Sequence, residues 1–233
     1  MSTELSRTTI DHPPYFSLDY MRWLIDFAKN KGYTFYTVAD FLKAGCPKEL
    51  AFIMKHDLDA KPITLPPILN LQRFAKIRST IYVRVTANDY NVMSYLVMPT
   101  LVKAEKDGFE IGLHSNFYEY ALLNGWNSQN TEYSGFDPVR VLKAEVKLLK
   151  SFLNIRGMST HRDLNYVHNA LPWLEAHWNT LQKKLDLDYQ AYDPRIMDNV
   201  IYVNEGYQPH LCWRNSTPED AVMTGKSICM LTH

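Results

Sequence analysis

The chain has 233 residues, which is long enough for one α/β domain with a substantial buried core. Lys plus Arg equal Asp plus Glu at 25 each, so no basic field would attract nucleic acid or an anionic lipid surface. The apolar stretches fall short of the roughly 18 residues that a membrane-spanning helix needs. We therefore expect one domain over residues 1–233, with no nucleic-acid partner and no membrane span.

Two further features bear on location. Residues 1–7 read MSTELSR and lack the apolar core of a secretory signal peptide. The three cysteines, Cys46, Cys212 and Cys229, have no spacing typical of a metal site or a disulfide framework. Such sparse, odd cysteine usage is typical of a reducing compartment. The sequence therefore favours a cytoplasmic protein and makes no prediction about its oligomeric state.

Helix and strand signals alternate along the chain. Ser17 can cap a first helix, and Gly32 is a suitable residue to end it. Later helical patterns occupy Val38–Lys43, Leu65–Lys76, Met93–Lys106 and the segment from Asp137 to Leu153, although Pro99 should kink or reset the third of these. The strand-like runs are Tyr33–Tyr36, Ala51–Met54, Thr80–Val85, Phe109–Asn116, Met158–Asp163, Val200–Val203 and Ser227–His233.

Strands separated by helices imply parallel pairing with right-handed crossover connections. The pattern therefore predicts an α/β fold, a (β/α) barrel of parallel strands. In such a barrel the carboxyl ends of all strands lie on one face, and that face carries the chemistry. Residues at predicted strand ends are thus the first candidates for a functional site.

Asp57 and Asp59 follow the apolar run Ala51–Met54 and precede a turn signal at Lys61-Pro62. Because side chains alternate along a strand, both carboxylates should point to the same side. Two like charges on a largely buried strand repel each other and lose hydration, and a cation or a shared proton relieves both costs. The alternative is a strand-end turn with two solvated Asp residues. His56 alternates away from Asp57, so we expect it to pack outside the barrel and to form a hydrogen bond there.

Three further strand-like runs close on a histidine, namely His114, His161 and His233. A single histidine at a strand end is more often a hydrogen-bonded structural residue than a ligand. Four runs that all end in Asp or His are better explained by one shared site at the carboxyl face of the barrel.

These residues resemble the motifs of the NodB-homology polysaccharide deacetylases, the family 4 carbohydrate esterases. His56-Asp57-Leu58-Asp59 and the run Glu110–His114 are similar to the first two motifs, in the form found in the cytoplasmic H-D-x-D branch. The likeness extends from the run Tyr20–Leu24 to Leu231-Thr232-His233, which matches the family's L-x-H motif. The resemblance implies a distorted barrel of about seven parallel strands.

The resemblance also implies a role for each matched residue. Asp57 is in the position of the catalytic base, and Asp59 is in that of a metal ligand. His114 matches the first of two metal-binding histidines in the H-S/T-x-x-H motif, and His233 matches the catalytic acid. Arg162 is a candidate for the arginine that orients the base. Because the sequence around Arg162 differs from the family's, a salt bridge elsewhere is the alternative.

Tyr118 is the main departure from the family, because it stands where the second metal-binding histidine is expected. Positions four apart share a helix face, so Tyr118 should still face the site, yet a neutral phenol is a weak ligand. Three outcomes stay open. His161 supplies the third ligand, water or Asn116 completes the shell, or the metal is lost, as in allantoinase-like relatives. The leading expectation is a divalent metal, zinc for preference, held by Asp59, His114 and His161.

The expected chemistry is hydrolysis of an N-acetyl amide. A bound cation can polarise the carbonyl, a carboxylate can take the proton of water, and a histidine can protonate the departing amine. The resemblance therefore predicts removal of an acetyl group from an N-acetylated sugar. Without an export signal, the expected substrate is a surface-polysaccharide or O-antigen precursor. The alternatives are a metal-independent amidohydrolase of the allantoinase type and an inactive carbohydrate-binding relative.

Overall fold

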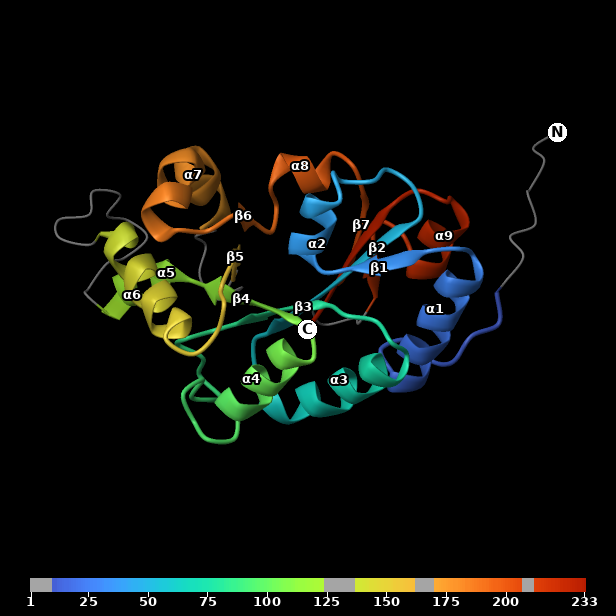
Figure 1. Cartoon of the computed structure of the whole chain (residues 1–233), viewed down its shortest axis with the longest axis horizontal. Coiled ribbons are helices and arrows are strands. Elements are labelled where there is room, and N and C mark those ends of the chain that lie inside the picture. Colours follow the sequence, from blue (N-terminus) through green and yellow to red (C-terminus); the bar gives the residue numbers. More distant parts are fainter. Residues whose placement is uncertain (1–9, 124–136, 162–169, 207–211) are drawn as a thin grey trace.

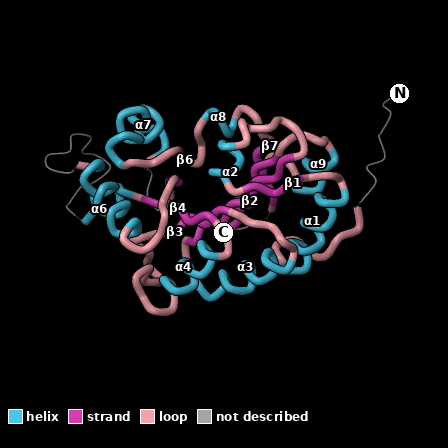
Figure 2. The backbone as a smooth tube through the Cα atoms, viewed as in Figure 1, coloured by secondary structure: helices cyan, strands magenta, loops and turns pink. Residues whose placement is uncertain are grey.

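The computed structural model describes residues 10–123, 137–161, 170–206 and 212–233. A curled sheet lies at the centre of the protein, and Figure 2 shows its strands surrounded by helices. The strands are β1 (Thr34–Tyr36), β2 (Ala51–Leu58), β3 (Thr80–Val83), β4 (Glu110–Ser115), β5 (Gly157–Thr160), β6 (Tyr189–Gln190), β7 (Ile201–Glu205), β8 (Trp213–Arg214) and β9 (Ile228–Thr232).

Helices lie on both sides of this sheet, with α3 and α4 on one side and α2, α7 and α8 on the other (Figure 1). The helices are α1 (Leu18–Asn30), α2 (Val38–Lys43), α3 (Leu65–Phe74), α4 (Met98–Lys106), α5 (Phe117–Leu123), α6 (Pro138–Lys150), α7 (Leu171–Leu185), α8 (Pro194–Met197) and α9 (Pro218–Met223), with a short 3₁₀ turn at Pro62–Thr64. All eight residues of β2 are buried, as expected for a parallel strand covered on both faces.

The strand order is β6-β5-β4-β3-β2-β9-β7-β8, with β1 paired to the first part of β2. Every strand pair is parallel except β7 with β8, so the predicted parallel α/β fold is confirmed. Within the described residues no pairing joins β6 to β8, and the sheet forms a half-barrel. That a single domain spans residues 1–233 stays a prediction.

Most predicted elements form, and the differences have local causes. Ser17 caps α1 by accepting a hydrogen bond from the backbone N–H of Tyr20, and Gly32 follows the helix end with a positive φ of 89°. The helix predicted from Met93 begins instead at Met98, because Pro99 lies in its first turn. Proline is well suited to the first turn of a helix, where its missing N–H costs nothing. Of the two predicted effects of Pro99, it therefore sets a new helix start and does not kink a longer helix.

In the described part of the chain, no helix is both long enough and apolar enough to cross a membrane.

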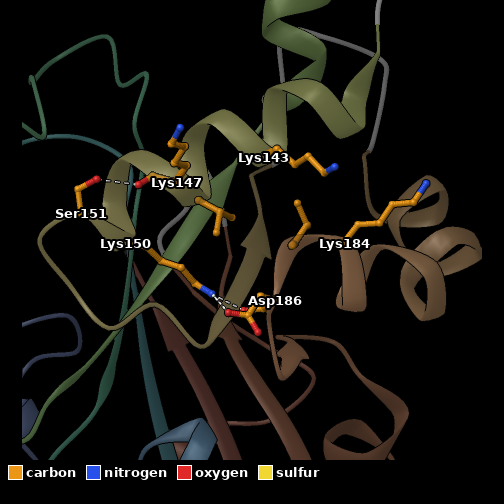
Figure 3. A pocket seen from close by; sticks show the side chains of 8 residues that line it. Lys143, Lys147, Lys150, Ser151, Lys184 and Asp186 are labelled. Atoms are coloured by element: carbon orange, nitrogen blue, oxygen red, sulfur yellow. Dashed lines mark hydrogen bonds and ion pairs between the residues drawn. The ribbon is translucent and has the colours of Figure 1, made fainter.

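A groove of about 430 Å³ lies between α6 and α7 (Figure 3). Lys143, Lys147, Lys150 and Lys184 line it, and Lys150 Nζ lies 2.8 Å from Asp186 Oδ2. None of the five predicted site residues within the described part of the chain lines this groove, so it is separate from them.

Candidate active site

The candidate residues lie at the carboxyl ends of neighbouring parallel strands. Asp57 is the last but one residue of β2, and Asp59 follows its end. His114 belongs to the end of β4, and His161 directly follows β5. His233 directly follows β9. The register pairs His56 of β2 with Thr232 of β9, so Asp57 and His233 occupy adjacent positions on neighbouring strands.

Asp59, His114 and His161 form a compact group. Oδ1 of Asp59 lies 3.1 Å from Nε2 of His114 and 3.6 Å from Nε2 of His161. The two imidazole rings are edge to face, with centroids 5.2 Å apart and an interplanar angle of 87°. One ligand atom from each of the three residues fits within 4.8 Å of the other two. This geometry makes the group a possible metal site.

The donor set fits zinc. Two imidazoles and one carboxylate form a ligand set of catalytic zinc sites, which keep a fourth position open. Ligand atoms about 2.0–2.1 Å from a tetrahedral zinc are about 3.4 Å apart. The two contacts of Asp59 Oδ1, at 3.1 and 3.6 Å, bracket that value. Among the described residues, Asp57 Oδ1 and Asn116 Oδ1 are also buried and accept no hydrogen bond, so both oxygens are able to bind a cation or its water.

The charges within the group favour a cation. Burial raises the pKa of Asp59, but the hydrogen bond and charge of His114 and the charges of His161 and His233 outweigh it and lower the pKa to about 2. Burial lowers the pKa of His114, but the charges of Asp57 and Asp59 and the hydrogen bond to Asp59 outweigh it and raise the pKa above 6.5. A divalent ion would displace the His114 proton and supply the positive charge that the carboxylates attract.

Asp57 is buried beside this group. Its Oδ2 lies 3.5 Å from His114 Nε2, and its side chain is 4% exposed. Burial raises the pKa of Asp57, while the positive charges of His114, His233 and Lys55 oppose the rise. Lys55, two positions earlier on β2, is itself buried, with its ammonium 4.8 Å from the Tyr192 ring centroid. Burial and the nearby positive charges thus act in opposite directions on this carboxylate, which is placed to act as a base.

His56 has the opposite orientation, as alternation along β2 requires. Its Nδ1 lies 2.6 Å from the Thr232 hydroxyl, and its Nε2 lies 2.7 Å from the Gln72 amide nitrogen. Burial lowers the pKa of His56 to about 4. The predicted structural role of this histidine, hydrogen-bonded away from Asp57, is therefore confirmed.

His233 is paired with a carboxylate that the sequence analysis missed. Glu205, the last residue of β7, accepts a hydrogen bond from the His233 backbone N–H at 2.9 Å. Its Oε2 also lies 3.3 Å from His233 Nδ1. Burial lowers the pKa of His233, but the hydrogen bond to Glu205 and the charges of Asp57, Asp59 and Glu205 outweigh it and raise the pKa above 6.5. A histidine whose pKa is raised in this way is suited to donating a proton.

The other residues that the sequence singled out are Arg162 and Tyr118. Arg162 lies outside the described residues. Tyr118 is half-buried in the first turn of α5, where its ring lies 4.9 Å from the ring of Phe117 and packs against the largest apolar cluster. His161, from the end of β5, completes a group of three possible metal ligands with Asp59 and His114. Of the three outcomes left open for the third ligand, this arrangement favours His161.

Two more charged residues near the site were missed. Arg84 directly follows β3, and Glu119 belongs to the first turn of α5. The guanidinium nitrogen Nη2 of Arg84 donates to both carboxylate oxygens of Glu119, at 2.6 and 2.7 Å. The rule that singled out Asp59 and His114, a polar residue at a strand end, also applies to Arg84 and Glu205. No sequence signal pointed to Glu119.

Neither a protein-family model nor a curated protein sequence matches this chain. Among solved structures, the chain is similar to the deacetylase PplD from Streptococcus pyogenes, determined in complex with acetate. The TM-score is 0.50 at 10% sequence identity, over 91% of this chain and 80% of that one. At this identity the likeness shows a shared fold, the fold of a deacetylase.

Proposed function

We propose that the protein is a hydrolase that removes the acetyl group from an N-acetylated sugar. The observation that carries this proposal is the grouping of Asp57, Asp59, His114, His161 and His233 at the carboxyl ends of parallel strands. The set contains a possible metal site, a buried carboxylate and a histidine that is paired with Glu205. These groups can polarise the carbonyl, accept a proton from water and protonate the departing amine, which are the three functions that amide hydrolysis needs. The shared fold with a deacetylase supports the same reaction class.

Asp57 is the proposed base. Its carboxylate takes a proton from the attacking water, whose oxygen forms a new bond to the acetyl carbon. His233 is the proposed acid and gives its proton to the amine nitrogen as the carbon–nitrogen bond breaks. Glu205 holds the His233 ring through Nδ1, at 3.3 Å. The products are acetate and a free amino sugar.

Asp59, His114 and His161 are the proposed ligands of a divalent cation, with zinc as the expected ion. When bound, such an ion polarises the carbonyl and lowers the pKa of water. Arg162 remains a candidate for orienting Asp57. The proposed substrate is a cytoplasmic precursor of a surface polysaccharide or O-antigen, such as a nucleotide-linked N-acetylhexosamine.

The test is to incubate zinc-loaded protein with nucleotide-linked and free N-acetylhexosamines and to follow acetate by NMR. Asp57→Asn should lose acetate release, whereas Asp26→Asn, a matched change at an exposed position of α1, should not. Full activity of Asp57→Asn would refute the base assignment. Activity that survives complete metal removal would identify the metal-independent amidohydrolase instead. Sugar binding without any acetate release would identify the inactive binding relative.

A further inference from the structure

His161 directly follows β5, so the strand pairing sets the position of its backbone but not the orientation of its ring. Its backbone N–H donates to the carbonyl of Ser115 at 2.9 Å, which ties the end of β5 to the end of β4. That bond fixes the backbone but does not itself set the χ1 and χ2 angles of the ring. A metal ligand normally has its second ring nitrogen held by another group, which fixes both the tautomer and the ring orientation.

Glu119 is in the right place to be that group. Its Oε1 lies 3.8 Å from Nδ1 of His161, an ion-pair distance, whereas the other ring nitrogen, Nε2, faces Asp59. The same oxygen accepts a hydrogen bond from the Asn116 side-chain amide at 3.3 Å. The Glu119 side chain is 18% exposed and that of His161 is 12% exposed, so little solvent competes for the contact.

Arg84 in turn fixes the Glu119 carboxylate. Its Nη2 donates to both carboxylate oxygens, at 2.6 and 2.7 Å, and to the carbonyl of Thr86 at 3.1 Å. The Arg84 side chain is only 6% exposed. A buried, charge-assisted pair of this kind has a defined geometry, and the arginine offsets the negative charge that Glu119 adds near Asp57 and Asp59.

We propose that Glu119, held in place by Arg84, is a positioning residue for His161 and thereby sets the metal affinity of the site. This inference rests on the proposed function, specifically on its metal site. A carboxylate facing Nδ1 favours the tautomer with its proton on Nδ1 and its lone pair on Nε2. Nε2 is the nitrogen that faces Asp59, at 3.6 Å, and is therefore the one available to a cation.

His114 provides an internal contrast. Among the described residues, the two carboxylates that pair with His114, those of Asp57 and Asp59, both contact its Nε2 and not its Nδ1. The ring is held instead by its buried position on β4 and by Asp59. Loss of Glu119 should therefore affect the metal through His161 and leave the His114 contact with Asp59 in place.

The test is zinc affinity, measured on metal-free protein by competition with a chromophoric chelator. Glu119→Gln keeps the size of the side chain but loses the charge, and should weaken zinc binding by about 10–100-fold. Asp107→Asn is the matched control, because Asp107 also pairs with an arginine, Arg73, at 2.6 Å, away from the site. Its affinity should equal that of the unchanged protein. Far-UV circular dichroism checks that each variant is folded.

A second measurement separates positioning from a general structural effect. In the metal-free protein, ¹⁵N chemical shifts of the His161 ring should report the Nδ1–H tautomer, and Glu119→Gln should convert it to a mixture. Glu119→Ala should behave similarly.

Each outcome points to one conclusion. Unchanged zinc affinity and an unchanged tautomer in Glu119→Gln would overturn this inference and leave the metal site standing. If the unchanged protein bound no zinc, both this inference and the metal assignment would be wrong, whereas acetate release without metal would still support a hydrolase.

Discussion

Glu145 should make the stability of this fold depend on pH in a way that a single substitution can remove. The side chain belongs to α6 and is almost fully buried behind the end of β4. Its Oε2 accepts a hydrogen bond from Ser115 Oγ at 2.5 Å, and its Oε1 accepts one from the Tyr120 hydroxyl at 3.3 Å. Burial raises the pKa of Glu145 from 4.5 to about 7, against the effect of these two hydrogen bonds.

The sign follows from proton binding. Because the folded protein binds this proton more tightly than the unfolded chain does, the stabilisation is fully present below pH 4.5 and is lost as the pH rises through 7. At about 1.4 kcal/mol per pKa unit, the loss is about 3 kcal/mol, most of it between pH 5 and pH 8. Glutamine at this position cannot ionise and retains groups that can bond Ser115 and Tyr120, so Glu145→Gln should remove that loss.

The measurement is urea unfolding of both proteins at several values of pH from 5 to 8. The stability of Glu145→Gln relative to the unchanged protein should rise by about 3 kcal/mol across this range. Glu175→Gln, a change at an exposed position of α7, should give no such trend. A constant difference between Glu145→Gln and the unchanged protein at every pH would show that Glu145 is ionised in the folded state and would refute the reasoning.

Three further predictions concern the proposed reaction. Asp57→Asn should lower turnover by roughly two to four orders of magnitude with unchanged zinc content, whereas Asp59→Ala should lose zinc and activity together, as measured by elemental analysis and acetate release. Glu205→Gln removes a carboxylate that raises the pKa of His233, so the alkaline limb of the pH–kcat profile should move to lower pH; an unmoved limb would exclude His233 as the acid. Dialysis against a chelator should abolish acetate release, and added zinc should restore it; activity that persists would argue for metal-independent hydrolysis.

The parts of the site that could be predicted share one physical basis. Side chains alternate along β2, and parallel strands end on one face, so Asp57 and Asp59 could be placed together with His114 from sequence alone. The fold class followed from the same alternation of strands and helices. These are local or topological rules, and they hold without knowledge of contacts between distant residues.

The supporting residues could not be predicted, because their partners are distant in sequence. Glu205 contacts His233 across 28 positions, and Arg84 contacts Glu119 across 35. A glutamate in a helix is ordinarily a solvated surface residue, so nothing local distinguishes Glu119 from Glu175. Only the packing of α5 against the end of β3 gives the carboxylate of Glu119 a buried guanidinium to bind.

The register of the sheet explains how His161 can stand in for the expected ligand at Tyr118. His114 of β4 pairs with Ser159 of β5, so His161 lies two residues further along the neighbouring strand. Oδ1 of Asp59 reaches both imidazoles from β2, on the other side of β3. A ligand at the end of β5 can thus join the group formed by Asp59 and His114. In the proposed site α5 then has a different task, since Glu119, one residue after Tyr118, would orient the histidine that binds the metal.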